Sequence, residues 1–310
     1  MMLNTVSTSS GPDIVVTGTM AYDTIHTPTG SASEVLGGSA TYFALAARLF
    51  NYVGIIAVVG NDFRSEDLDL LKSVGIDLTG VEQQAGPTFR WEGRYNNDLS
   101  EATTLETQLN VLASFQPAVP ALYHHADILF LANLAPDIQL NVLNQYHRRP
   151  RMIAADTMNF WIENARPDLL TLLKQIDLFI INEGEARLLT GEHNVVKAAR
   201  AIQALGSFDL VIKRGGYGAI LFHNDEIFAI PSYPLEEVID TTGAGDSFAG
   251  GFLGALSIEP TRIRKAMIMG NLVASFTVEA FSVKRLVELT WPVLKERYLA
   301  FREIVRLEDL

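Results

Sequence analysis

The segment 240–251, DTTGAGDSFAGG, contains residues whose types and spacing fit phosphate chemistry. Gly243 and Gly245 allow a tight turn after an expected strand end at residues 238–239. A turn that opens a helix presents free backbone N–H groups, which bind anions. Asp246 places a carboxylate beside them, so the segment predicts phosphoryl transfer to a hydroxyl. The apolar residues that follow at helical spacing are Phe248, Phe252 and Leu256.

Each part of this segment has an expected role. Asp246 is the expected general base, because a sugar hydroxyl is a poor nucleophile until its proton is removed. Gly243, Ala244 and Gly245 are expected to hold the transferring phosphoryl oxygens with backbone donors. The alternative is that Asp246 only caps its helix, but the paired glycines favour the catalytic interpretation.

Asn182 and Glu185 follow an apolar run that predicts a buried strand, 178–181. The pattern N-x-x-E is typical of a helix capping box. It also suits a magnesium site in which Glu185 acts through water, since Mg²⁺ usually keeps several waters. The two interpretations are compatible.

Two further segments are candidates for binding. Lys213 ends an expected strand and is followed by a glycine-rich turn that includes Gly215 and Gly218, which suits a nucleotide phosphate or adenosine; the alternative is a plain hairpin. Gly37 and Gly38 open an expected helix that carries Thr41 and can hold a polar substrate.

Asp23 follows the first expected strand. A carboxylate there can accept hydrogen bonds from two neighbouring hydroxyls of a substrate. The alternative is a solvated loop residue.

Composition excludes several classes of protein. The 310 residues include 24 basic and 36 acidic side chains, and this net charge of −12 disfavours nucleic acid as a partner. With no cysteine, disulfides and thiolate zinc sites are excluded. No run is apolar enough to cross a membrane and no signal peptide is seen, so we expect a cytoplasmic protein. P-loop and dinucleotide fingerprints are missing, which argues against a P-loop kinase and a nicotinamide oxidoreductase.

The pattern of elements predicts an α/β fold. Apolar strands alternate with amphipathic helices, which indicates a mostly parallel, Rossmann-like sheet with helices on both faces. Binding sites in such folds gather at the carboxyl ends of the strands. The expected strands are 14–18, 54–59, 128–131, 152–155, 178–181 and 210–213. The expected helices are 39–50, 137–147, 167–175, 183–190, 195–205, 245–256, 262–280 and 292–306.

Two segments interrupt this alternation. Residues 19–36 and 87–105 predict strands of a small separate β-sheet, a lid over the site; the alternative is a pair of surface hairpins. Residues 1–11 are expected to be a flexible tail, and residues 12–310 a single domain.

These motifs together resemble the ribokinase-like carbohydrate kinases, the phosphofructokinase-B family. Residues 240–248 resemble its C-terminal signature, Gly37 and Gly38 its N-terminal signature, and Asn182 with Glu185 its N-x-x-E magnesium motif. The resemblance implies the fold described above, an ATP- and Mg²⁺-dependent kinase, and a homodimer formed through the lid.

The resemblance also assigns roles to single residues. It implies Asp246 as base, Asp23 as a ligand of substrate hydroxyls, and Asn271 on the adenine side of ATP. Asp240 and Thr242 match two ligands of a monovalent cation, which implies a K⁺ site.

The chain departs from ribokinases proper in the first signature. Their G-G-K-G-A-N becomes Gly37-Gly-Ser-Ala-Thr-Tyr42, so Tyr42 stands in the Asn position and ribose is not the expected substrate. Residues 156–159, DTMN, resemble a D-x-N segment with one extra residue, which makes Asn159 a candidate substrate ligand. Arg90 and Trp91 in the lid are further candidates.

We therefore expect a kinase that phosphorylates a hydroxyl of a small sugar or polyol. The alternatives are a nucleoside or inositol kinase of the same family, and a non-catalytic sugar-sensing relative. An aromatic slot beside Asp23 favours a nucleoside, and a wholly polar slot favours a sugar. The intact Asp246, Asn182 and Glu185 argue against the sensor, which needs no base.

Overall fold

The computed structural model describes residues 11–99, 102–206 and 208–306, so the expected tail falls almost wholly outside them. The strands of the large sheet are β1 (Ile14–Thr17), β4 (Val53–Gly60), β5 (Ile76–Gln84), β8 (Ile128–Leu131), β9 (Met152–Ala155), β10 (Leu178–Asn182), β11 (Asp209–Lys213), β12 (Ala219–His223) and β13 (Glu226–Ile230). Within the described residues these nine strands lie in the order β13-β12-β11-β10-β9-β8-β1-β4-β5. The strands from β5 to β11 are parallel, and β12 and β13 extend one edge in antiparallel fashion.

The sheet is buried on both faces. Along β1, Val15 packs into one hydrophobic core and Val16 into the other, and the central strands repeat this alternation. Both faces of each strand must then be apolar, which explains the continuous hydrophobic runs that made these strands predictable. The edge strand β5 was not predicted, because its exposed positions carry polar residues.

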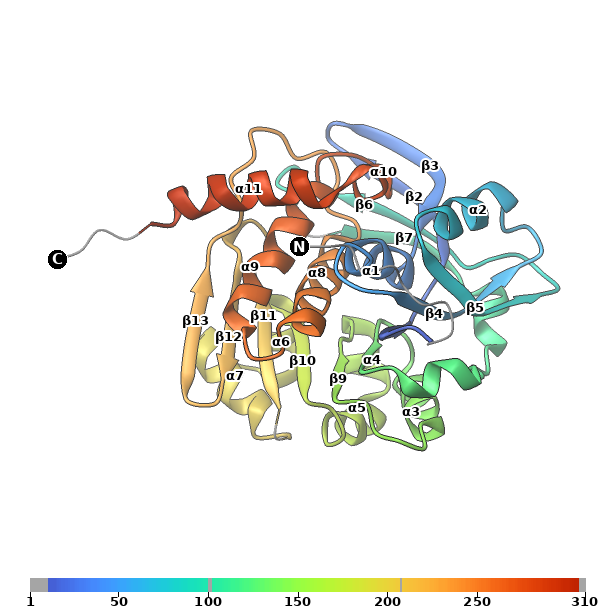
Figure 1. Ribbon diagram of the computed structural model, residues 1–310, viewed down its shortest axis with the longest axis horizontal. Coiled ribbons are helices and arrows are strands. Elements are labelled where there is room, and N and C mark those ends of the chain that lie inside the picture. Colours follow the sequence, from blue (N-terminus) through green and yellow to red (C-terminus); the bar gives the residue numbers. More distant parts are fainter. Residues whose placement is uncertain (1–10, 100–101, 207, 307–310) are drawn as a thin grey trace.

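Helices cover the two faces. One core includes residues of α1 (Ser39–Ala47), α2 (Ser65–Ser73), α8 (Ala244–Ile258), α9 (Ile263–Thr277), α10 (Lys284–Glu288) and α11 (Trp291–Ile304). The other includes residues of α3 (Pro136–Gln145), α4 (Asn159–Asn164), α5 (Arg166–Leu173), α6 (Glu183–Thr190) and α7 (Val195–Gln203). In Figure 1, α1, α8 and α9 lie together over one face of the sheet. None of the helices in the described part of the chain combines the length and apolar character that crossing a bilayer requires.

A second, smaller sheet confirms the expected lid strands. It consists of β2 (Ala21–Thr27), β3 (Gly30–Gly37), β6 (Arg90–Tyr95) and β7 (Ala102–Gln108). Within the described residues its order is β3-β2-β6-β7, and it lies at the upper right of Figure 1. We call this sheet the lid.

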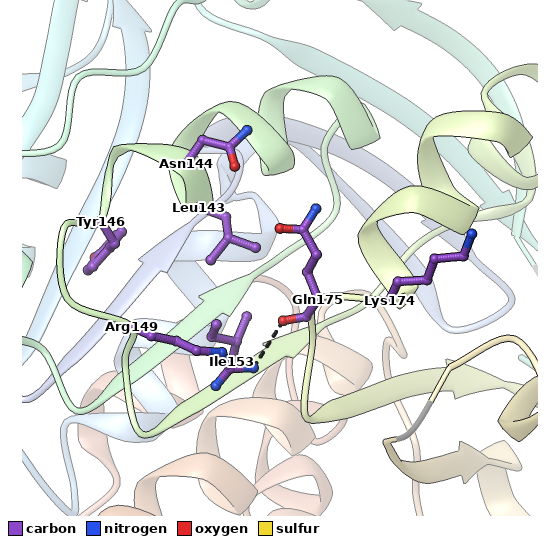
Figure 2. Close-up of a pocket in the computed structure, with 7 residues that line it drawn as sticks. All are labelled: Leu143, Asn144, Tyr146, Arg149, Ile153, Lys174 and Gln175. Atoms are coloured by element: carbon purple, nitrogen blue, oxygen red, sulfur yellow. Dashed lines mark hydrogen bonds between the residues drawn. The ribbon is translucent and has the colours of Figure 1, made fainter.

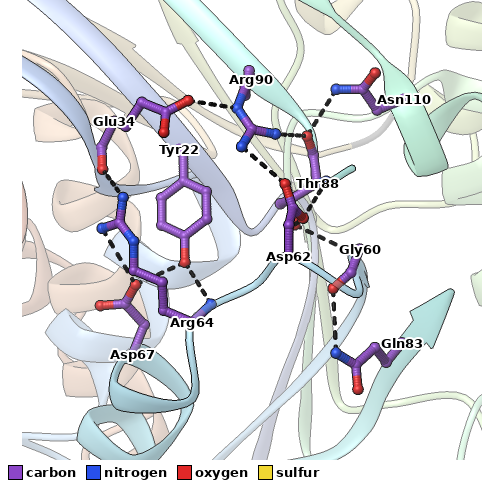
Figure 3. Close-up of polar contacts among 10 residues, drawn as sticks. All are labelled: Tyr22, Glu34, Gly60, Asp62, Arg64, Asp67, Gln83, Thr88, Arg90 and Asn110. Atoms are coloured by element: carbon purple, nitrogen blue, oxygen red, sulfur yellow. Dashed lines mark hydrogen bonds and ion pairs between the residues drawn. The ribbon is translucent and has the colours of Figure 1, made fainter. Parts of the chain in front are cut away.

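A polar network joins the lid to the segment before α2 (Figure 3). The ring of Tyr22 lies 4.3 Å from the guanidinium carbon of Arg64, whose backbone N–H donates to the Tyr22 hydroxyl at 2.8 Å. Arg90 makes ion pairs with Glu34 at 2.7 Å and with Asp62 at 2.8 Å. The lid is therefore held by side chains on the face that carries Tyr22 and Arg90.

Candidate active site

The start of α8 forms the expected glycine turn. Gly243 is its N-cap residue and has a φ of 72°, a conformation that residues with a Cβ rarely adopt. The ring of Tyr42 covers it, so a Cβ there would lie 2.4 Å from ring carbons. The expected strand end at residues 238–239 is wrong, because the chain between β13 and α8 is a loop. Ile239 donates its backbone N–H to Val278 instead.

Lys213 reaches this turn from the carboxyl end of β11. A Cβ on Gly245 would lie 2.6 Å from the Nζ atom of Lys213. The ammonium group is therefore directly in front of the start of α8, where the dipole of the helix and its free N–H groups attract anions. A positive side chain therefore lies at the same helix start as the backbone donors.

Asp246 lies in the first turn of α8. Burial raises the pKa of its carboxyl to about 6, and the positive charge of Lys213 opposes the rise. A carboxylate with this pKa is ionised at neutral pH and accepts a proton more readily than an exposed aspartate. Its position and its basicity both suit a general base.

Two further acids face the same lysine. Burial raises the pKa of Asp156 and of Glu185, and Lys213 lowers both. The negative charge of Asp246 raises both pKa values. The ends of β9, β10 and β11 thus bring two carboxyls and one ammonium group together, as expected for the carboxyl edge of a parallel sheet. Asp246 joins them from the start of α8.

Asn182 and Glu185 form a complete capping box. The Asn182 side chain accepts the Glu185 backbone N–H at 2.8 Å, and Oε2 of Glu185 accepts the Asn182 N–H at 2.8 Å. The structural interpretation of this motif is therefore confirmed. It fixes the Glu185 carboxyl, which is buried near Lys213, so the cap and a site role remain compatible.

Asp23 lies on β2 and is only 4% exposed. Its carboxyl covers Gly37, where a Cβ would lie 1.9 Å from Oδ2. Burial raises the pKa of Asp23 to about 7, the backbone N–H of Gly38 lowers it, and the charges of Asp240 and Asp246 raise it. Asp23 therefore belongs to the same cluster and is not a solvated loop residue. Thr41 lies in the first turn of α1 and is buried.

The residues expected around ATP lie at the ends of β10 and β11, in the turn before β12 and on α9. Gly215 is exposed, Gly218 has a φ of 88°, and Asn271 donates from Nδ2 to the carbonyl of Pro231 at 3.1 Å. Gly216, which lies between the two glycines, accepts a hydrogen bond from Ser232. The glycine turn and the start of the β13–α8 loop are thus adjacent, and Asn271 contacts the same loop.

The lid presents Trp91, not Arg90, to Asp23. Trp91 pairs in register with Asp23, so both side chains point to the same face, whereas Arg90 pairs with Tyr22 on the other. The indole lies flat over Gly93, where a Cβ would be 2.1 Å away, and donates to Thr104 at 3.2 Å. Arg90 is engaged with Glu34 and Asp62 and is not brought to the cluster.

Asn159 is likewise not brought to the cluster. It is exposed at the start of α4, and it is Asp156, 5% exposed, that faces Lys213. The extra residue in this segment carries Asn159 into the helix. Asp156 was not predicted as a site residue, although its place directly after β9 was a usable signal.

The signature loop also contacts the lid. The Thr242 hydroxyl lies 3.1 Å from the Tyr95 hydroxyl, and Thr241 donates to the carbonyl of Leu99 at 3.0 Å. Asp240 is buried and accepts the Thr242 N–H through Oδ1. Tyr95 was not predicted; its position two residues after Gly93 on the inward face of β6 was the available signal.

Several buried polar atoms around this loop lack a partner within the described residues. Because buried polar groups in native proteins nearly always have one, such atoms indicate a place for a ligand, ion or water. They include Oγ1 of Thr41, the hydroxyl of Tyr42, Oδ1 of Asp156, Oδ2 of Asp240 and Oγ of Ser247.

Two surface cavities lie away from this cluster. One, of about 440 Å³, is lined by residues of the α3 and α5 region, among them Tyr146, Arg149 and Lys174 (Figure 2). The other, of about 470 Å³, lies on the lid face of Tyr22 and Arg90, and Trp91 also contributes to its lining. The residues of the C-terminal signature line neither cavity. Residues 241–246 of this signature are half-buried.

The sequence as a whole matches a family of known activity. A model of the pfkB family carbohydrate kinases matches residues 12–288. The chain belongs to this family. It is a kinase of the carbohydrate and nucleoside kinase group, with the ribokinase fold.

Relatives of this pfkB-family kinase differ in the acceptor that their names give. A cytidine kinase from Thermococcus kodakarensis is 33% identical over 251 residues, which cover 79% of this chain and 88% of that protein. The nucleoside kinase of Methanocaldococcus jannaschii has a TM-score of 0.74 at 20% identity, over 94% of this chain and 100% of that one. A structure from E. coli described as a ribokinase II with ATP and Mg²⁺ has a TM-score of 0.77 at 18% identity, over 93% and 99% of the chains.

Proposed function

We propose that this kinase transfers the γ-phosphoryl group of ATP to a hydroxyl of a nucleoside, with Asp246 as general base. The observation that carries the proposal is that Asp246, Lys213 and the Gly243–Gly245 turn lie together at the start of α8. An ionised base, a positive charge and backbone donors are the groups that phosphoryl transfer to an alcohol requires.

The reaction follows from these groups. As the acceptor oxygen bonds to the γ-phosphorus, its O–H bond breaks and the proton passes to Asp246. The bond between the γ-phosphorus and the bridging oxygen breaks, and ADP leaves with that electron pair. The N–H groups at Gly243 and Gly245 and the ammonium of Lys213 stabilise the charge on the transferring oxygens. The expected donor at Ala244 is not available, because its N–H donates to the carbonyl of Thr241 at 3.2 Å.

For ATP we propose Asn182, Gly215, Gly218 and Asn271 as binding residues, with Lys213 at its phosphates. Glu185 and Asp156 suit a hydrated Mg²⁺, because both are buried carboxyls and Asp156 keeps a partnerless oxygen within the described residues. When bound, Mg²⁺ neutralises phosphate charge. Within the described residues no group of three or more acidic or histidine side chains could hold a metal ion. Water and the phosphates of ATP would supply the remaining ligands of Mg²⁺.

The nucleoside is favoured by Trp91. Asp23 suits two neighbouring hydroxyls of the sugar, and Gly37 and Gly38 lie next to it. Thr41 follows them on α1 and is a further candidate. The indole of Trp91 is flat against Gly93 beside Asp23, so its free face can stack on a base. The cytidine kinase relative supports the same choice.

Two further features remain proposals. Asp240 and Thr242 suit a K⁺ ion, since Oδ2 of the buried Asp240 is without a partner in the described residues. The lid suits a homodimer interface, by resemblance to the family.

A free sugar is the second candidate, because the family model describes carbohydrate kinases. The experiment that tests both is a coupled ADP-release assay with cytidine, adenosine, inosine, ribose, fructose and myo-inositol. We expect turnover on at least one nucleoside with kcat/KM above that for every sugar. If a sugar is the best acceptor, the nucleoside assignment is wrong. If Asp246→Asn keeps a near-normal kcat on the best acceptor, Asp246 is not the general base.

A further inference from the structure

The phenol of Tyr42 is buried at the site, and the part of the chain that the structure describes offers its hydroxyl no hydrogen-bond partner. Tyr42 lies on the first turn of α1 and is 1% exposed. Its hydroxyl finds no partner within the described residues, which is rare for a buried polar group in a native protein. Its ring covers Gly243.

The charges of nearby acidic side chains act on this hydroxyl. Burial, then the charges of Asp23, Asp240 and Asp246 and the phenol of Tyr95, raise the pKa of Tyr42 well above its ordinary value. The group is therefore a neutral O–H donor at any physiological pH. Asp23, the neighbour whose charge acts on it most, is an acceptor when ionised.

We propose that Tyr42 determines acceptor specificity by donating a hydrogen bond to an oxygen of the sugar's vicinal diol. This rests on the proposed function. A sugar hydroxyl between the two side chains donates its hydrogen to Asp23 and accepts from Tyr42. The pair selects an acceptor whose hydroxyl both donates and accepts at this point. An asparagine in this position, as in ribokinases proper, has a shorter side chain with two donor hydrogens and an acceptor oxygen.

The ring and the hydroxyl of Tyr42 have separable roles. The ring packs over Gly243 and supports the turn, and Tyr42→Phe keeps it. Without an acceptor molecule bound, the hydroxyl makes no hydrogen bond that stabilises the fold within the described residues. Its removal should therefore leave Tm unchanged or raise it. A purely structural residue would show no effect on the acceptor.

Tyr146 provides the matched control. Its hydroxyl is also buried without a partner in the described residues, but it lies by the remote cavity between α3 and β9 (Figure 2). Tyr146→Phe should change Tm by no more than Tyr42→Phe does. It should leave every kinetic constant unchanged. The comparison separates loss of a buried hydroxyl from loss of an acceptor contact.

The experiment measures Tm, the KM for ATP, and the dissociation constant of the best nucleoside and of its 2′-deoxy and 3′-deoxy forms. In Tyr42→Phe we expect unchanged or higher Tm, unchanged ATP KM, and roughly two- to tenfold weaker nucleoside binding. For one deoxy form, which lacks the contacted oxygen, the penalty should vanish.

Unchanged nucleoside affinity in Tyr42→Phe overturns the inference alone, as does an equal penalty for both deoxy forms. Wild-type protein that phosphorylates no acceptor in the panel overturns the proposed function and this inference together.

Discussion

The Nζ atom of Lys213 lies in front of Gly245, 2.6 Å from where a Cβ of that residue would be. Lys213 ends β11 and Gly245 lies in the first turn of α8, so the contact joins the sheet to the helix start. A single ammonium group thereby lowers the pKa values of Asp156, Glu185 and Asp246. Before ATP binds, the positive charge of Lys213 offsets part of the negative charge of these acids.

Replacing Lys213 by Met should lower kcat by about 10²-fold, the usual loss for one positioned group that stabilises developing charge. Tm should stay near the wild-type value or rise at pH 5, which lies below the raised pKa of Asp246 of about 6. Steady-state kinetics with saturating ATP checks the prediction. A kcat within twofold of wild type would show that this ammonium group does not act on the transferring phosphoryl.

The two turn glycines should respond differently to alanine. Gly243→Ala forces a positive φ on a residue with a Cβ and meets the buried ring of Tyr42, so it should cost at least about 1 kcal/mol of stability, or about 2–4 °C in Tm. Gly245→Ala meets only the flexible end of Lys213. It should keep Tm within 2 °C and lower kcat. Thermal unfolding and kinetics on the same samples compare them, and equal loss of Tm would contradict the distinction.

Activity should fall in acid. The base form of Asp246 is lost as the pH drops through its raised pKa of about 6, and the acceptor form of Asp23 through about 7. We therefore expect kcat/KM for the acceptor to decrease below about pH 7 and more steeply below about pH 6. In Lys213→Met the lower limb should move to higher pH, because the group that opposes the rise is gone. A profile flat from pH 5 to 8 would be inconsistent with both assignments.

The buried carboxyl of Asp23 should lower the free energy of unfolding above neutral pH. Asp23 has a raised pKa in the folded state, so the folded protein binds more protons than the unfolded chain between about pH 4 and 7. Its contribution therefore becomes less favourable as the pH rises through this window. Asp23→Asn should raise Tm at pH 8 more than at pH 4, while it weakens acceptor binding. Scanning calorimetry of both proteins at the two pH values measures this. If Asp23→Asn has a lower Tm than the wild type at pH 8, Asp23 stabilises the protein there.

Trp91 and Arg90 offer a matched pair on opposite faces of β6. Trp91→Ala should weaken nucleoside binding about 5- to 150-fold, the range of base–aromatic stacking at about 1–3 kcal/mol, and leave the ATP KM unchanged. Arg90→Gln breaks the ion pairs with Glu34 and Asp62 (Figure 3), so it should lower Tm with a smaller effect on the nucleoside. Calorimetric titration of both variants tests the assignment. If both variants weaken nucleoside binding equally, the nucleobase does not stack on Trp91.

Local patterns determined much of this protein. The apolar runs of β8 and β9 predicted their bounds, and α6 was predicted with its capping box, because both signals depend on near neighbours in the chain. The signature around Asp246 predicted a helix start with an acid beside it for the same reason.

Only the tertiary structure decided which side chains meet. Strand alternation separates Arg90 from Trp91, but the register with β2 decides that Trp91 faces Asp23. One extra residue before Asn159 leaves Asp156 at the site, and Lys213 and Tyr42 reach the turn across more than thirty residues of sequence. These contacts depend on how strands and helices pack over one another, and that packing is a property of the whole core, which no short pattern encodes.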